Sequence, residues 1–296
     1  MTSRFTMHLS DIGVPALFVV LWSTGFIGAR LGLPHAGPLT FLALRYAIAA
    51  ALLVLVAVAM RAPWPRRMSE VGHYAVAGLL VHGVYLGGVF LGISLGVEAG
   101  VAALIVGLQP LLTAALAGML LGERVTAWQW AGLALGLLGV ALVLERKLGQ
   151  GPGDALGSVA CLVALLGITA GTLYQKRYCG SMDLRTGSVV QFAAAGIATL
   201  PLALLFEDMR IDWNGEFVFA LLWLVLVLSL GAISLLYVLI RRGAAAQVAS
   251  LFFLVPPCTA LIAWPLFGET LSTAALLGMA LTAVGVALAR RGAAKA

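Results

Sequence analysis

Charged residues are scarce in this sequence. Only 10% of the 296 residues are Asp, Glu, Lys or Arg, whereas an ordinary soluble domain carries about 25%. Hydrophobic residues make up 62%, and the mean hydropathy is +1.06. A single soluble core of this length cannot cover so much apolar surface. The composition therefore argues against a soluble enzyme, a nucleic-acid-binding domain or a disordered chain, and indicates a polytopic membrane protein.

Motifs of metal sites and enzymes are missing as well. The three cysteines, Cys161, Cys179 and Cys258, form no CxxC pair and have no metal-ligand spacing. HExxH, GxSxG and P-loop motifs are absent. The basic residues lie in small groups between apolar segments, which is typical of loop anchors. We therefore expect no enzymatic activity, no cofactor, no metal and no nucleic-acid partner; the expected partners are a small-molecule substrate and the lipid bilayer.

Long apolar runs dominate the chain. A membrane-spanning helix takes about 20 residues, and the runs are rich in Leu and Ala rather than alternating, which disfavours a transmembrane barrel. The sequence predicts an all-α fold of ten transmembrane helices over residues 12–31, 38–60, 71–95, 98–121, 125–145, 154–175, 186–206, 216–239, 245–268 and 272–290.

The loop charges predict how the chain is oriented. With the N-terminus in the cytoplasm, thirteen of the eighteen Lys and Arg residues fall in inner segments and four fall in outer ones. Because positively charged loops stay inside, we expect both termini in the cytoplasm and a multi-pass location in the bacterial inner membrane.

The sequence also contains an internal repeat with a shift of 146 residues. The shift aligns Pro110 with Pro256, Thr113 with Thr259, Gly122-Glu123 with Gly268-Glu269, Gly132 with Gly278, and Gly139 with Gly285. We expect one five-helix unit over residues 1–148, a linker over 149–154, and a second unit over 155–296. Since five is an odd number, the two units must face opposite ways, as in alternating-access transporters.

These features resemble a known family. The ten helices, the five-plus-five repeat, and a proline followed by an apolar run, Gly-Glu and Gly-x6-Gly are similar to the EamA-type exporters of the drug/metabolite transporter superfamily. The second copy departs at Thr270, where a basic residue often stands. Trp22-Ser23 and Arg45-Tyr46 also fit the first two helices of the family. Among its members, the chain looks most like the YddG-type exporters of aromatic amino acids.

No Asp or Glu lies in the middle of a predicted helix. Buried carboxylates commonly couple transport to protons or sodium, and the resemblance implies that small multidrug-resistance relatives carry such a Glu in their first helix. The sequence therefore predicts facilitated or weakly coupled transport of a substrate that is neutral or carries both charges.

A few polar and aromatic residues inside the predicted helices are candidates for substrate contacts. His82 and Tyr85 share a helix face. Trp22 and Phe26 lie four residues apart and can stack on a substrate side chain. Gln109 offers an amide beside Pro110. The alternative for each is helix packing or, for Gln109, a hinge alone. Ser250 and Phe253 are weaker candidates.

Other residues have expected structural roles. Pro110, Pro256 and Pro257 are predicted hinges for gating. Arg45, whose repeat partner is Gln191, can hold a carboxylate or extend outward to the interface; since the second helix is peripheral in the family, the structural role is favoured. Glu123 and Glu269 are expected to stabilise the next helix along the chain.

We expect an alternating-access exporter of small metabolites, with amino acids favoured and aromatic ones first. Its cavity is expected between helices one, three, four, six, eight and nine. A multidrug or sugar-type carrier is the alternative within transport, and a membrane scaffold is the alternative outside it. Because one chain contains both halves, a monomer suffices.

Overall fold

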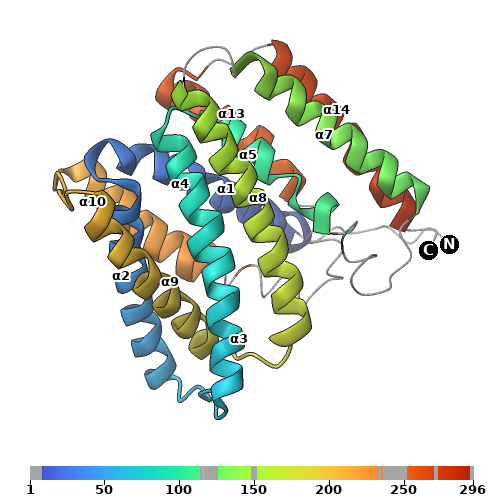
Figure 1. Ribbon diagram of the computed structural model, residues 1–296. Coiled ribbons are helices and arrows are strands. Elements are labelled where there is room, and N and C mark those ends of the chain that lie inside the picture. The colour runs from blue at the N-terminus through green and yellow to red at the C-terminus, as the bar shows by residue number, and fades with distance from the viewer. Residues whose placement is uncertain are drawn as a thin grey trace.

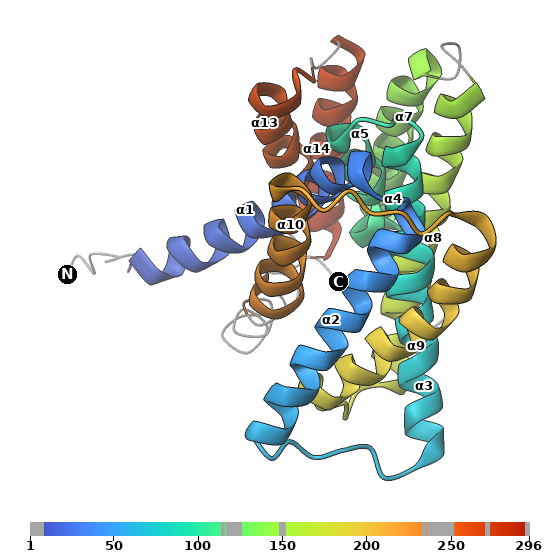
Figure 2. The same cartoon turned by 90° about the vertical axis from the view of Figure 1, so that its left-hand side faces the viewer.

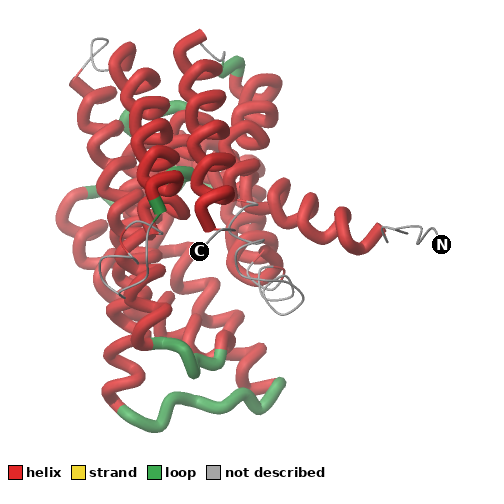
Figure 3. Tube along the Cα trace, turned by 90° about the vertical axis from the view of Figure 1, so that its right-hand side faces the viewer, coloured by secondary structure: helices red, strands yellow, loops and turns green. Residues whose placement is uncertain are grey.

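The computed structural model describes residues 9–113, 116, 126–147, 152–232, 235, 252–269 and 273–293. Within these ranges the secondary structure is helical, and the β pairing is a single bridge between Ala36 and Ile211 (Figure 3). The elements are α1 (Leu9–Gly32), η1 (Leu33–His35), α2 (Pro38–Ala59), α3 (Met68–Gly78), η2 (Leu79–Leu86), α4 (Gly87–Ser94), α5 (Ala99–Val106), α7 (Ala127–Lys147), α8 (Pro152–Tyr178), α9 (Leu184–Phe206), α10 (Gly215–Leu222), η3 (Trp223–Ala232), η4 (Phe252–Leu254), α13 (Val255–Phe267) and α14 (Thr273–Ala293).

Six helical segments of the described chain are long and apolar enough to cross a membrane. They are Gly13–His35, Pro38–Ala59, Met68–Ser94, Ala155–Tyr178, Leu184–Phe206 and Gly215–Ala232. Shorter apolar helices cover Ala99–Thr113, Trp130–Leu142, Val255–Phe267 and Leu276–Gly285. These helices follow the apolar runs of the sequence to within a few residues wherever the structure describes both ends. The expected all-helical, polytopic membrane protein is confirmed.

Helix ends follow ordinary capping chemistry, and one cap comes from far along the chain. The side chain of Asp183 accepts the Arg185 N–H at the start of α9, and Asn214 accepts from Phe217 at the start of α10. The first turn of α2 is capped instead by Glu207, whose carboxylate accepts the backbone N–H groups of Leu39 and Thr40, both at 2.8 Å. Orphan N–H groups at helix N-termini need such acceptors.

Two π-helical segments interrupt long helices. The segment η2 separates α3 from α4, and η3 continues α10. They end at Leu86 and Ala232, which are 146 residues apart. A π-helix widens the turn and disturbs the regular ladder of backbone hydrogen bonds, and such segments often occur at functional sites.

The helices α7 and α14 lie side by side along most of their length (Figure 1). Both ends of α14 are displaced from those of α7 by 146 residues. A Cβ atom added to Gly139 would lie 2.5 Å from the carbonyl oxygen of Gly278, and one added to Gly285 would lie 2.5 Å from that of Gly132. The Gly-x6-Gly spacing therefore allows two backbones to touch, as small residues do between membrane helices.

A second pair, α2 and α9, packs in the lower half of Figure 1, and η2 and η3 contact both of these helices or one of them. In Figure 2, α1 runs from the side of the bundle across its upper half, where it contacts α10, η3 and α13. On α4, Gly88 and Gly92 approach the backbone of α8, as a small-residue stripe predicts, whereas Gly96 has a φ of 104° and forms the turn after α4.

Candidate functional site

Polar side chains are buried where α2, η2, α9 and η3 meet. We call this group the polar cluster; it consists of Arg45, Tyr46, His82, Tyr85, Gln191 and Ser229. All six residues are buried, although they lie on segments long and apolar enough to cross a membrane. Because a polar group in an apolar interior is costly unless it is bonded, the partners of each side chain decide what the cluster can do.

Arg45 is the most costly member of the cluster. It is the eighth residue of α2, which places it about 10 Å along the helix axis at a rise of 1.5 Å per residue. Its exposed fraction is 6%. Nη2 donates to Ser229 Oγ at 3.5 Å, and Nε has no hydrogen-bond partner. The expectation that Arg45 extends outward to the interface is therefore wrong: η3 covers the side chain and holds it inside the bundle.

His82 is held by two neighbours. The hydroxyl of Tyr46 donates to the backbone carbonyl of His82 at 2.6 Å, which uses an acceptor of the π segment η2. The His82 ring stacks on Phe192, with centroids 4.2 Å apart and planes 20° apart. Its Nδ1 atom has no hydrogen-bond partner. The ring is therefore fixed by stacking while one ring nitrogen stays unsatisfied.

Tyr85 follows His82 by three residues in η2, and both side chains are buried. The expected shared location of these two residues in the interior therefore agrees with the structure. Gln191 donates from Nε2 toward Gln175 Oε1 at 3.4 Å and Met182 Sδ at 3.6 Å. The repeat partner of Arg45 is thus bonded within its own half of the molecule.

The aromatic residues of α1 make different contacts from those expected. Trp22 contacts Phe18 one turn earlier, with ring centroids 5.4 Å apart, and meets Phe252 edge-on at 5.1 Å. Phe26 is buried in the main apolar core and shares no ring contact with Trp22. Sequence reasoning missed Phe252, whose only signal was its place beside Phe253. Ser250 and the side chain of Phe253 lie outside the described residues.

Gln109 joins two helices of different halves. Its Nε2 donates to Thr172 Oγ1 of α8 at 3.2 Å and to Thr113 Oγ1 at 3.1 Å. Helix α5 ends at Val106, a turn covers residues 107–108, and Pro110 lies in the helical stretch that follows. Pro256 and Pro257 similarly occupy the first turn of α13. The prolines begin new helical stretches, where their missing N–H is tolerated; a hinge role stays a prediction.

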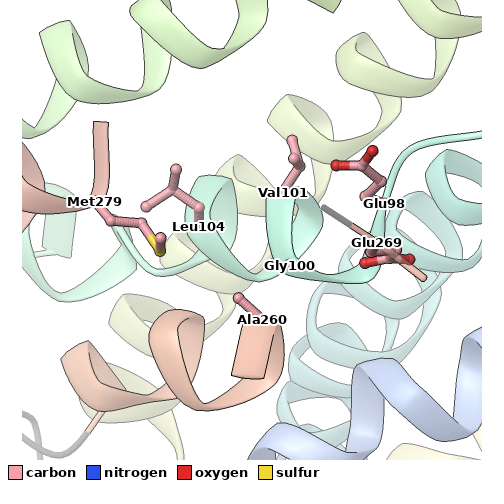
Figure 4. A pocket seen from close by; sticks show the side chains of 7 residues that line it. All are labelled: Glu98, Gly100, Val101, Leu104, Ala260, Glu269 and Met279. Carbon is pink, nitrogen blue, oxygen red and sulfur yellow. The ribbon is translucent and has the colours of Figure 1, made fainter. Parts of the chain in front are cut away.

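A small pocket lies apart from the polar cluster. Figure 4 shows it between α5, α13 and α14, with Glu98 and Glu269 at one end; the other lining residues are Gly100, Val101, Leu104, Ala260 and Met279. None of the predicted substrate residues lines it. This pocket is therefore no evidence for the expected substrate site.

Glu269 binds the start of a helix that is distant in the sequence. Its Oε1 accepts the Ala99 N–H at the start of α5 at 3.2 Å and lies 3.9 Å from Arg30 Nε. Burial raises the pKa of this carboxyl above its usual value. The expectation that Glu269 stabilises the next helix, α14, is wrong, because the fold brings α5 closer to its carboxylate. Glu123 lies outside the described residues.

A comparison with known families identifies the chain. The profile of the EamA-like transporter family matches residues 12–145 and again residues 155–291. The chain belongs to the EamA-like transporter family. The expected resemblance is thereby confirmed, and the family and its named members are transporters.

Relatives of this EamA-family protein are similar over nearly their whole length. The uncharacterized inner membrane transporter YedA of Escherichia coli (strain K12) is 25% identical over 98% of this chain and 93% of its own. A probable amino-acid metabolite efflux pump of Salmonella typhimurium is 26% identical over 95% and 94%. A solved crystal structure shares the fold, with a TM-score of 0.63 and 22% identity over 95% of this chain and 98% of that one. The expected multi-pass inner-membrane location is confirmed.

Proposed function

We propose that this EamA-family protein exports amino acids, aromatic ones first, by alternating access. The observation that carries the proposal is the polar cluster, because a transporter needs polar groups inside an apolar bundle to recognise an amino acid. The Salmonella relative named as a probable amino-acid metabolite efflux pump supports this choice of substrate class.

The proposed mechanism needs two inverted halves, which we assign to residues 1–148 and 155–296 with a linker at 149–154. Three observations support this division. The ends of α7 and α14 are displaced by 146 residues, the starts of α2 and α9 have the same displacement, and so do the ends of η2 and η3. In this proposal ten helices cross the membrane, five in each half, and both termini are cytoplasmic.

Two groups of side chains are proposed to contact the substrate. His82 and Tyr85 provide hydrogen bonds, and Gln109 provides an amide at the contact between α8 and the end of α5. Trp22 and Phe26, with Phe253 and Ser250 from the ninth helix, are proposed to receive the apolar part. Pro110, Pro256 and Pro257 are proposed to mark the points where the helices bend during the change between states.

Transport is proposed to be facilitated or weakly coupled. The sequence places no carboxylate in the middle of an apolar run, and such carboxylates commonly bind the coupling proton or sodium ion. The concentration gradient of the substrate then drives export. A monomer contains both proposed halves and needs no partner subunit.

Uptake into proteoliposomes tests the proposal. Labelled phenylalanine, tryptophan and threonine are offered to vesicles of purified protein, with and without a pH gradient, and empty vesicles serve as the control. Saturable uptake that does not depend on the gradient is the expected result. Uptake that requires the gradient contradicts uncoupled transport. No uptake of any amino acid by folded, inserted protein contradicts the substrate class, and sugars and cationic drugs are then tested in the same vesicles.

A further inference from the structure

Arg45 is a buried cation for which the described residues provide no counter-ion. Arg30, Arg185 and Arg210 each lie within 4 Å of a carboxylate, whereas no ion pair of the described chain includes Arg45. A charge at this depth is costly, and buried charges are normally paired. An unpaired arginine in a membrane helix is therefore a candidate for binding an anion.

The unused donors of Arg45 lie along one edge of its guanidinium group. Nε has no partner, and Nη2 makes one long contact of 3.5 Å to Ser229 Oγ. The N–H groups of Nε and Nη2 point in parallel, so this edge matches the two oxygens of a carboxylate. The Ser229 hydroxyl donates its own hydrogen to Leu224 O at 3.1 Å and so remains an acceptor toward Arg45.

Further features point to the same place. His82 interacts electrostatically with Arg45, and its unpartnered Nδ1 can accept a hydrogen bond from an ammonium group. The two π segments η2 and η3 flank the site and carry His82 and Ser229. Because Arg45 and His82 are closed off from solvent, a ligand reaches them only after these segments move relative to α2.

We propose that the Nε–Nη2 edge of Arg45 binds the carboxylate of the transported amino acid. The inference rests on the proposed function and deepens it, because it names the substrate group that is recognised and a residue that recognises it. The substrate carboxylate supplies the counter-charge that the protein lacks at this depth, and its ammonium group faces His82. A substrate without a carboxylate leaves Arg45 uncompensated and binds poorly.

The first test uses the wild-type protein. Uptake of labelled phenylalanine into proteoliposomes is inhibited with unlabelled phenylalanine, 3-phenylpropionate or phenylalaninamide. The proposal predicts that both carboxylates inhibit and that the amide requires a concentration about 30-fold higher or more, the effect expected when a buried charge loses its partner. Equal inhibition by phenylalanine and phenylalaninamide overturns the assignment without any variant. Where tryptophan or threonine is the amino acid carried, its own amide is used.

The second test uses Arg45→Gln and Arg45→Lys, with the exposed Arg66→Gln as a matched loss of one positive charge. We expect Arg45→Gln to raise KM for phenylalanine about 30-fold or more and to abolish the preference over the amide. Arg45→Lys keeps the charge but not the edge and is expected to fall between. A merely structural arginine would lower transport while keeping the acid-over-amide preference, and that result overturns the proposal.

The two proposals fail in different ways. If the wild-type protein carries no amino acid, the proposed function fails and the Arg45 assignment fails with it. If the wild-type protein carries phenylalanine and folded Arg45→Gln keeps its KM and its preference, only the Arg45 assignment fails. Thermal unfolding and gel filtration establish that each variant is folded, and if Arg45→Gln does not fold, Arg45→Lys and the wild-type inhibition series decide.

Discussion

The segments α2–η2 and α9–η3 have nearly the same boundaries after a shift of 146 residues, yet they carry different side chains. Arg45 and Tyr46 of the first segment align with Gln191 and Phe192, and His82 and Tyr85 align with Leu228 and Gly231. The glycines and prolines that set the backbone occur in both halves. The repeat thus determines how the helices pack, whereas the chemistry of the polar cluster belongs mainly to one half.

The largest expected effect concerns the shared framework. Gly139→Val and Gly285→Val each place a side chain against the backbone of the opposite helix. We expect each to destabilise the protein by about 3 kcal/mol or more, because the backbones cannot separate without loss of packing. Yield of monodisperse protein and thermal unfolding measure the effect.

The matched control is Gly72→Val, since a Cβ at Gly72 has no neighbour within 4 Å. If only one of the two glycine variants is harmful, the equivalence of the two helices in this contact is disproved.

The next effect concerns the asymmetric residues. His82→Ala removes a proposed substrate contact, and we expect it to reduce kcat/KM about tenfold in folded protein, as loss of one hydrogen bond does. Leu228→Ala at the aligned position is expected to lower stability but to leave transport per folded molecule within about twofold. Equal transport losses in both variants would show that the cluster is no more specific than its counterpart.

A smaller effect is expected at Trp22, whose aligned residue is Ile168. Trp22→Ala removes the edge-on contact with Phe252 and the proposed stacking surface. We expect a reduction of kcat/KM of about fivefold for phenylalanine, with a smaller loss for threonine, and little change in Ile168→Ala. Initial rates in proteoliposomes measure this. A loss of the same size for both substrates argues against stacking.

Caps at the starts of α2 and α9 compare the halves outside the apolar core. The α2 cap comes from Glu207, which is distant in sequence, and the α9 cap comes from Asp183. We expect Glu207→Ala and Asp183→Ala each to cost about 1 kcal/mol, measured by thermal unfolding. Glu207→Ala should also loosen the contact with the segment after α9, which accelerated proteolysis there would detect; unchanged proteolysis contradicts that link.

The smallest expected effect is the pH dependence at Asp183. Hydrogen bonds from Arg185 lower the pKa of this carboxyl, so the ionised form stabilises the fold. This contribution is present above the unfolded-state pKa of about 3.9 and is lost as the pH falls through the lower folded-state value. The difference in thermal midpoint between wild type and Asp183→Asn, below about 1 kcal/mol for an exposed pair, should vanish near pH 2. A difference that grows toward low pH would be the wrong sign.

Most helices were predictable because each is a long apolar run ended by Gly, Pro or charge, as at Gly37-Pro38 and at Gly268. The contact between α7 and α14 was foreshadowed by their shared glycine spacing. Three features of the site were not predictable. Whether Arg45 reaches the interface depends on η3, which is distant in sequence. The acceptors for Gln109 and the helix bound by Glu269 also depend on which segments the fold brings together.

Sequence position alone could not decide among neighbouring residues either. Phe252 and Phe253 are equivalent in composition, and only the local helix geometry determines that Phe252 meets Trp22. The π segments likewise have no sequence signature, because Leu79–Leu86 reads as an ordinary apolar helix. Tertiary packing decided these cases.

The glycine contact between α7 and α14 also bears on how the two copies can diverge. Gly139 meets Gly278, and Gly285 meets Gly132, so each half supplies one surface of both contacts. A bulkier residue in one copy cannot be accommodated by a smaller one in the other, because glycine is already the smallest. These four positions therefore lack a compensating second substitution, and drift after a gene duplication is expected to change the lipid-facing residues of both helices long before it changes these.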